Sequence, residues 1–281
     1  MQNKNLINKL KSNAELAMAA YGYYHLATTS KNQSFIELKK ANSQIDSDEN
    51  FIEKEITLID IMDSTYKNYE AHCFNPPQTK KKEKIGKLDG DMTPTQSKRF
   101  FEKYDVLIHQ PNTESGFSAT LFQNKESKEY TLAIRGTEPS NMGDIKADVN
   151  LMAGNLPKKQ YLDMLLFYYQ CIGTIPFYVD STSMPQDKKS LEYKLWKKLY
   201  QRSIESKYKP YITQSLLQDS NLPPTPSNFT PPITATTKLT ITGHSLGGAL
   251  TQMFVLSFAD YAKRDCGIIN EVYTTHFRVA S

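Results

Sequence analysis

The residues from Lys238 to Phe254 read KLTITGHSLGGALTQMF, and they carry the clearest pattern of secondary structure in the chain. Its first part is short and rich in β-branched residues, which is typical of a buried strand. Its last part continues to Arg264 as an apolar run that predicts a helix packed on a sheet. A further β-rich run, EVYTT at 271–275, follows that helix. A strand, a helix and a second strand form a βαβ unit, which requires parallel strands in one sheet.

The turn between the predicted strand and helix matches the pattern GxSxG through Gly243, Ser245 and Gly247. In a nucleophile elbow this turn is so tight that the serine takes a strained backbone conformation, and the glycines leave room for neighbouring backbone. The serine hydroxyl is then presented at the carboxyl end of the sheet. We therefore expect Ser245 to be a catalytic nucleophile; the alternative is an ordinary glycine-rich turn.

Acyl transfer also needs N–H groups directed at the oxyanion of the tetrahedral intermediate. Leu246 directly follows the serine at a predicted helix N-terminus, so its N–H is one candidate. The second candidate is Thr137, which follows the β-rich run at 129–136. That run is expected to form a hairpin with the run at 116–123. The alternative for the segment Arg135-Gly136-Thr137 is a simple turn that ends the strand.

Two segments, IRGTEPSNMGDIKADVNL at 134–151 and LTITGHSLGGALTQMF at 239–254, together resemble the class 3 lipases, the fungal type of triacylglycerol lipase with its bacterial relatives. The resemblance extends over roughly 116–273, about half of the chain, with specific motifs only in these two segments. It implies an α/β-hydrolase fold, with a mostly parallel sheet and flanking helices. It also implies that residues 138–148 lie near a lid, and that Asp148 has a structural role.

The activity that the resemblance implies is hydrolysis of lipid carboxylic esters, of triacylglycerol lipase or phospholipase type, through an acyl-enzyme on Ser245. Thr137 and Leu246 would form the oxyanion hole. The substrate partner would be a lipid ester, and no cofactor or metal is implied. Two alternatives stay open: a truncated or degenerate, non-catalytic lipid-binding or interaction protein on the same scaffold, and a transacylase.

The acid and the histidine of the triad follow the serine in α/β-hydrolases. After Ser245 the candidates are Asp260, Asp265, Glu271 and His276. Both aspartates fall at the end of the predicted helix, away from the active face, and His276 comes directly after the next strand, which is too early for the base. We therefore expect the chain to end before its acid and base, and to have little or no hydrolase activity.

The remaining histidines are not expected to replace the base. His25, His72 and His109 precede the serine, contrary to the chain order of this fold, and each is expected to be a surface or core residue. His244 adjoins the serine on a sharp turn, where neighbouring side chains point in different directions, and is expected to be a packing group.

The sequence predicts two regions. Residues 1–97 are expected to form a helical N-terminal region that ends in a basic, proline-containing linker. Residues 98–281 are expected to form an α/β-hydrolase core, incomplete at the C-terminus, with helices between 157 and 208. Near 215–237 the chain is rich in proline and lacks apolar periodicity, which predicts a surface loop inserted in the core.

Composition excludes several classes of protein. No run approaches the roughly 20 apolar residues that cross a bilayer, and the N-terminus predicts an amphipathic helix instead of a signal peptide, so a cytoplasmic protein or one exported by a non-classical route is expected. Cys73, Cys171 and Cys266 fit neither a disulfide framework nor a zinc site. The net charge of +4 suits transient contact with an anionic membrane surface or simply solvated loops. The lysine runs lack the pattern of a nucleic-acid site.

Overall fold

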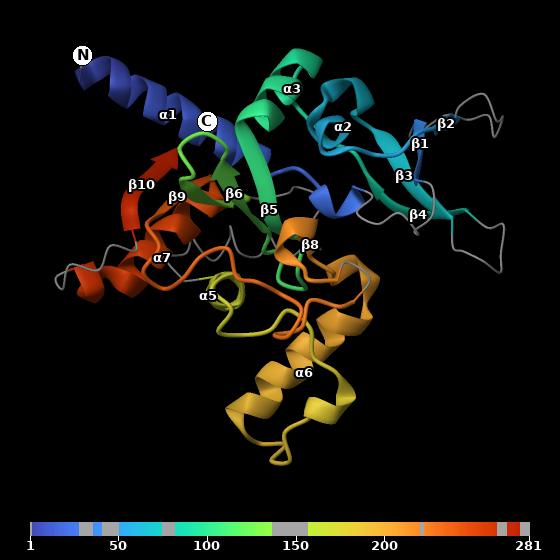
Figure 1. The fold of residues 1–281 in the computed structure, drawn as a ribbon, viewed down its shortest axis with the longest axis vertical. Coiled ribbons are helices and arrows are strands. Elements are labelled where there is room, and N and C mark those ends of the chain that lie inside the picture. The colour runs from blue at the N-terminus through green and yellow to red at the C-terminus, as the bar shows by residue number, and fades with distance from the viewer. Residues whose placement is uncertain are drawn as a thin grey trace. The chain divides into compact units, whose positions relative to one another are not determined.

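The computed structural model describes residues 2–27, 36–40, 51–74, 82–136, 157–219, 222–262 and 269–275 (Figure 1). The chain divides into two compact units. The first contains Met1–Ala20, Val106–Gln123 and Ser127–Ser281, and the second contains Tyr21–Asp105 and Asn124–Glu126. None of the described helices combines the length and the apolar content needed to cross a membrane.

The first unit is built on a six-stranded sheet in the order β10-β9-β7-β6-β5-β8. Its strands are β5 (Tyr104–Gln110), β6 (Ala119–Asn124), β7 (Tyr130–Ile134), β8 (Tyr211–Ile212), β9 (Leu239–His244) and β10 (Ile269–Thr275). Its α-helices are α1 (Gln2–Ala19), α5 (Lys158–Cys171), α6 (Leu191–Ile204) and α7 (Leu246–Ala262). Three short 3-10 helices lie at η4 (Ser181–Ser183), η5 (Ser206–Tyr208) and η6 (Gln214–Leu216).

The sheet is mixed. β9 pairs in parallel with β10 on one side and with β7 on the other, as the predicted βαβ unit requires. β6 and β7 form the predicted antiparallel hairpin, and β5 and β8 are also antiparallel. The expected mostly parallel sheet is therefore wrong for the described strands, whereas the α/β class with flanking helices is confirmed. The reason is that a connection as short as residues 125–129 permits only antiparallel pairing.

The core of the first unit lies where α5 and α7 pack together and α7 covers the sheet. Leu246, Leu250 and Phe254 recur every fourth residue along α7 and are fully buried, because this spacing places them on one face of the helix. The ring of Phe254 lies edge-on to that of Tyr168 on α5, with 5.1 Å between ring centroids. Each such buried side chain contributes roughly 1.5–3 kcal/mol by leaving water, so this face fixes α7 on the sheet.

Helix α1 also packs on this sheet, where it contacts β9, β7 and β10. Leu16, Ala17 and Ala19 are buried, and the hydroxyl of Thr242 on β9 donates a hydrogen bond of 3.2 Å to the carbonyl oxygen of Asn13. The N-terminal helix is therefore part of the first unit. The structure divides the chain after Ala20 and Asp105, and not at residue 97 as the composition indicated.

The second unit contains a four-stranded sheet in the order β2-β1-β3-β4, with every pair antiparallel. Its elements are η1 (Tyr24–Leu26), β1 (Ile36–Lys40), β2 (Phe51–Glu53), α2 (Leu58–Met62), η3 (Ser64–Tyr66), β3 (Tyr69–Phe74), β4 (Lys82–Lys87) and α3 (Pro94–Lys103). Within residues 1–97 the structure has the helices α1 and α2 but also these strands, and α3 begins at Pro94, inside the expected linker. Runs such as IELKK alternate apolar with charged residues over too few positions to stand out from a polar loop.

The proline-rich segment near 215–237 contains η6 and an isolated bridge between Leu217 and Phe229, and is otherwise irregular over its described residues. It is nevertheless pinned to the first unit. The side-chain amide of Asn228 donates hydrogen bonds to the carbonyl oxygens of Asp219, Leu222 and Pro223 within the same segment, and Ile233 is buried in the core. Asn228 therefore braces the loop internally, and Ile233 anchors it to the core.

Candidate active site

Ser245 occupies the turn between β9 and α7, and its backbone is left-handed, with a φ of +56°. For a residue with a Cβ this conformation costs roughly 1–2 kcal/mol, so the surrounding packing must impose it. The side chain of Ser245 is exposed. The strained serine that the sequence predicts is therefore present, with its hydroxyl at the surface and at the carboxyl end of a parallel strand.

Two glycines permit this turn because each lies against backbone. A Cβ on Gly243 would overlap the carbonyl oxygen of Gly247 and lie 2.9 Å from the nitrogen of Gly248. A Cβ on Gly247 would overlap the carbonyl oxygen of Ile134 and lie 2.9 Å from the carbonyl carbon and oxygen of Arg135. Real Cβ atoms essentially never approach other atoms within 3.0 Å, so neither position accommodates a side chain without movement.

The close approach at Gly247 also places the elbow beside the end of β7. This is the point where the segment Arg135-Gly136-Thr137 begins, so the structure brings the two predicted motifs together. Arg135 and Gly136 are both buried. Thr137 lies outside the described residues, and its role as an oxyanion donor stays a prediction.

Leu246 is the first residue of α7, and its side chain is buried under the helix. The N–H groups in the first turn of a helix have no acceptor within the helix, and they lie at the positive end of the helix dipole. The carbonyl oxygen of Ser245 accepts hydrogen bonds from the N–H groups of Gly248 and Ala249, at 2.9 and 3.2 Å. The elbow thus begins a regular helix whose first N–H, that of Leu246, suits an oxyanion donor.

Arg135 fixes the end of β7 in a way that the sequence did not indicate. Its N–H donates a 3.0 Å hydrogen bond to the carbonyl oxygen of Ser118, and its guanidinium donates to the side-chain oxygen of Asn112. Both acceptors belong to the connection between β5 and β6. The arginine of the RGT segment therefore ties the candidate oxyanion loop to a neighbouring loop at the same edge of the sheet.

A buried charged cluster supports that neighbouring loop. Asp163 on α5 accepts hydrogen bonds from the hydroxyls of Thr113 and Ser115, at 2.8 and 2.6 Å. It also pairs with Arg202 and Lys198 of α6, at 2.8 and 2.6 Å. Burial raises the pKa of Asp163, but the charges of Arg202 and Lys198 more than offset this and hold the pKa below its usual value.

The described histidines of the first unit do not include a general base in position. His109 lies on β5 and is buried, with its Nδ1 at 2.9 Å from the hydroxyl of Thr120. Three strand spacings separate β5 from β9, a distance of about 14 Å. His244 directly precedes the serine and is half-buried. His25 and His72 belong to the second unit.

The later candidates for the acid and base are not placed. Asp265 and His276 lie outside the described residues. Asp260 falls on α7 and Glu271 on β10, but the side chains of both also lie outside the described part of the chain. The turn that carries Ser245 is therefore described, while the oxyanion donors, the acid and the base stay predictions.

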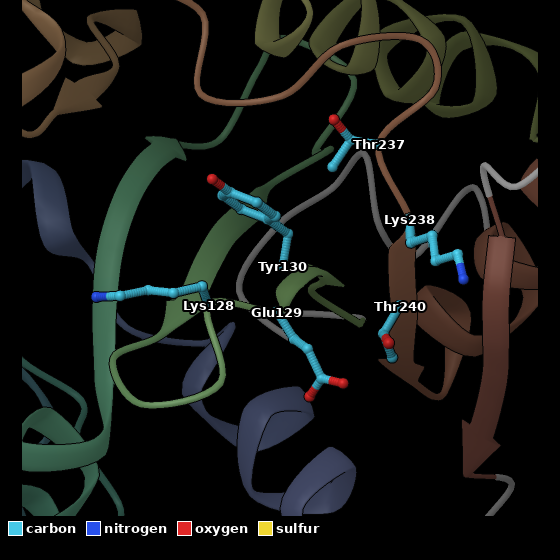
Figure 2. A pocket seen from close by; sticks show the side chains of 6 residues that line it. All are labelled: Lys128, Glu129, Tyr130, Thr237, Lys238 and Thr240. Carbon is cyan, nitrogen blue, oxygen red and sulfur yellow. The ribbon is translucent and has the colours of Figure 1, made fainter.

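A pocket of about 400 Å³ lies at the opposite edge of the sheet (Figure 2). Its lining residues are Lys128, Glu129, Tyr130, Thr237, Lys238 and Thr240. Tyr130 and Leu239 are the first residues of β7 and β9 and pair with each other, so this pocket is at the amino ends of the strands. From there to the end of β9 the strand rises about 17 Å, which is too far for this pocket to hold an acyl group against Ser245.

No family model, curated protein or solved structure matches this chain.

Proposed function

We propose that this protein is a serine-dependent hydrolase of lipid carboxylic esters, with Ser245 as its nucleophile. The observation that carries the proposal is the exposed, left-handed serine between β9 and α7, held by two glycines that contact backbone. This combination is what a nucleophile elbow requires. Its position also fits, because ligands of α/β sheets bind outside the carboxyl ends of the parallel strands.

The chemistry follows from the groups at this edge. The hydroxyl oxygen of Ser245 attacks the ester carbonyl, and the N–H of Leu246, with that of Thr137, stabilises the oxyanion. The bond to the alcohol then breaks and the alkoxide takes up the proton that the serine hydroxyl lost, which leaves an acyl group on Ser245; water then hydrolyses this acyl-enzyme to the free acid and restores the hydroxyl. The lipid nature of the substrate is supported by the resemblance of residues 134–151 and 239–254 to class 3 lipases.

The rate depends on a base that the described residues do not supply. In a serine hydrolase, removal of the histidine costs about 10⁶ in kcat, while the oxyanion hole and binding alone retain roughly 10³–10⁴ over water. We therefore expect hydrolysis to be slow unless His276 or another group outside the described residues accepts the serine proton.

Hydrolysis of a p-nitrophenyl acyl ester by the full chain tests this proposal, because p-nitrophenolate leaves without being protonated. We expect slow turnover by the wild-type chain and its loss in Ser245→Ala. Ser245 is exposed and the substitution removes only its hydroxyl oxygen, so this variant is expected to fold normally, which circular dichroism verifies. A parallel loss in His276→Ala would assign the base.

Two outcomes would contradict the proposal. Equal turnover by the wild type and Ser245→Ala would place the chemistry elsewhere. Turnover by neither chain, together with binding of lipid esters, would favour the non-catalytic lipid-binding alternative.

A further inference from the structure

The first half of α1 forms an exposed surface that is both apolar and basic. Leu6, Ile7 and Leu10 keep 53, 63 and 46 % of their surface exposed. Every residue from Lys4 to Lys11 is exposed, so no residue that the structure describes covers the apolar side chains. We call this surface the α1 patch, and its members are Lys4, Leu6, Ile7, Lys9, Leu10 and Lys11.

The patch is held rigidly because the other half of the same helix is anchored. Leu6, Leu10, Asn13, Ala17 and Ala20 recur at spacings of four and three, which places them on one helical stripe. The last three are buried, and the backbone of Asn13 is bonded to β9, whereas the first two are exposed. Figure 1 shows α1 as one continuous helix that extends to the N-terminus of the chain. The second half of this stripe packs on the sheet, whereas its first half, with Leu6 and Leu10, extends beyond the sheet and is exposed.

The charge around the patch indicates what it binds. Residues 2–14 contain three lysines and no acidic residue, although the whole chain is nearly balanced, with 34 basic and 30 acidic residues. On the helical wheel Lys4 and Lys11 lie on one side of the apolar residues and Lys9 on the other. Basic residues that flank an apolar face are typical of a helix that lies in the interface of an anionic membrane. If the α1 patch bound the same patch of a second copy of this chain, lysines would lie against lysines, which is unfavourable.

We propose that the α1 patch docks this protein onto the surface of a bilayer that contains anionic phospholipids. Leu6, Ile7 and Leu10 enter the region between headgroups and acyl chains, and the lysines contact the phosphate and carboxylate groups. The binding itself does not require hydrolase activity. Its expected role, to bring the protein to lipid esters, rests on the proposed function. Because α1 is bonded to Thr242, three residues before Ser245, docking holds the sheet that carries the elbow at the lipid surface.

Co-sedimentation of the full chain with vesicles tests this inference. One set of vesicles is pure phosphatidylcholine, and the other contains about one-third phosphatidylserine. We expect binding to the anionic vesicles, weaker binding to the neutral ones, and loss of the difference at high salt, since salt screens exposed charges. Replacing Lys4 and Lys11 by Gln lowers the partition coefficient about 25-fold, at roughly fivefold for each lysine.

Two matched double variants test whether binding depends on the apolar residues of the α1 patch or on any exposed leucine. Leu6→Ser with Leu10→Ser should lower binding to anionic vesicles at least tenfold, by an order-of-magnitude estimate from the apolar area withdrawn. Leu191→Ser with Leu256→Ser replaces two leucines that are 81 and 74 % exposed elsewhere in the same unit, and should leave binding unchanged. Circular dichroism checks that each variant keeps its helix content.

Three results would overturn the inference. They are failure of the wild type to bind anionic vesicles, binding that survives in the Leu6/Leu10 variant, and self-association that this variant abolishes in sedimentation velocity without any vesicle binding. Ser245→Ala should bind vesicles as the wild type does. A loss of hydrolysis with intact binding would therefore contradict only the proposed function.

Discussion

Replacing Gly247 by alanine sets two effects of known size against each other. In the interior of a helix, glycine to alanine stabilises by about 1 kcal/mol, because alanine loses less backbone entropy. Here the new methyl would overlap the carbonyl oxygen of Ile134 and lie 2.9 Å from the carbonyl carbon of Arg135. These atoms are backbone, and Ile134 is held in β7 by pairing with Ala119 of β6 and Gly243 of β9. Overpacking of this kind costs 3 kcal/mol or more when nothing flexible can move, by order of magnitude.

We therefore expect Gly247→Ala to destabilise the protein by about 2 kcal/mol or more, the difference between the two effects. Urea unfolding measures this as a lower midpoint, with Ser245→Ala as the control, since that variant adds no atom at the same turn. The variant should also lose its reactivity at Ser245, because the elbow must move away from β7. If Gly247→Ala is as stable as the wild type, or more so, helix propensity dominates and the close approach of α7 to β7 is refuted.

Three further predictions concern single residues. Ser245→Gly should be more stable than Ser245→Ala by about 1 kcal/mol, because only glycine adopts a φ of +56° without strain; equal urea midpoints would refute this. Asp163→Asn should cost about 3 kcal/mol at pH 7, because it removes the buried carboxylate and leaves Arg202 and Lys198 with only Glu114, at 2.9 and 3.1 Å, among the acidic partners described for them. Since the pKa of Asp163 is lowered in the fold, this loss should shrink as the pH falls below the unfolded value of about 3.9, and a loss that is constant with pH would contradict the ion pairing. Cys171 is buried, and burial raises the pKa of its thiol, so iodoacetamide should modify it only upon unfolding. Mass spectrometry of the digested protein measures this, and modification of the peptide that contains Cys171 in native buffer would contradict the prediction.

The elements that the sequence predicted well are those with local signals. The β6–β7 hairpin has two β-rich runs joined by a short polar turn, and the β9–α7–β10 unit changes period from strand to helix across GHSLGG. Each of these signals lies within a few consecutive residues. The strands at 36–40 and 82–87 lacked such a signal. The first alternates over too few residues, IELKK, the second, KEKIGK, has one apolar residue, and their pairing with β3 is decided by contacts across the chain.

The candidate site shows the same division. The position of Ser245 and Leu246 at a tight turn between a strand and a helix could be predicted from a motif, as could the need for a glycine at 247; the catalytic roles of Ser245 and Leu246 stay predictions. The partners that hold the site could not be identified, because they are distant in sequence. Arg135 donates to Asn112, which precedes it by 23 residues, and Asp163 pairs with Arg202, which follows it by 39. Polar pairs at such separations carry no periodicity that a single sequence reveals.

Covalent labelling by a fluorophosphonate, mapped by mass spectrometry of the digested protein, tests whether Ser245 is a nucleophile. Such a probe reacts with a serine that is exposed, activated and placed beside oxyanion donors. The proposed elbow predicts one adduct, on the peptide that contains Ser245, which disappears in Ser245→Ala and after unfolding in urea. An adduct at another residue, an adduct that persists in Ser245→Ala, or no adduct on the folded chain after prolonged exposure would contradict the assignment of Ser245 as the nucleophile.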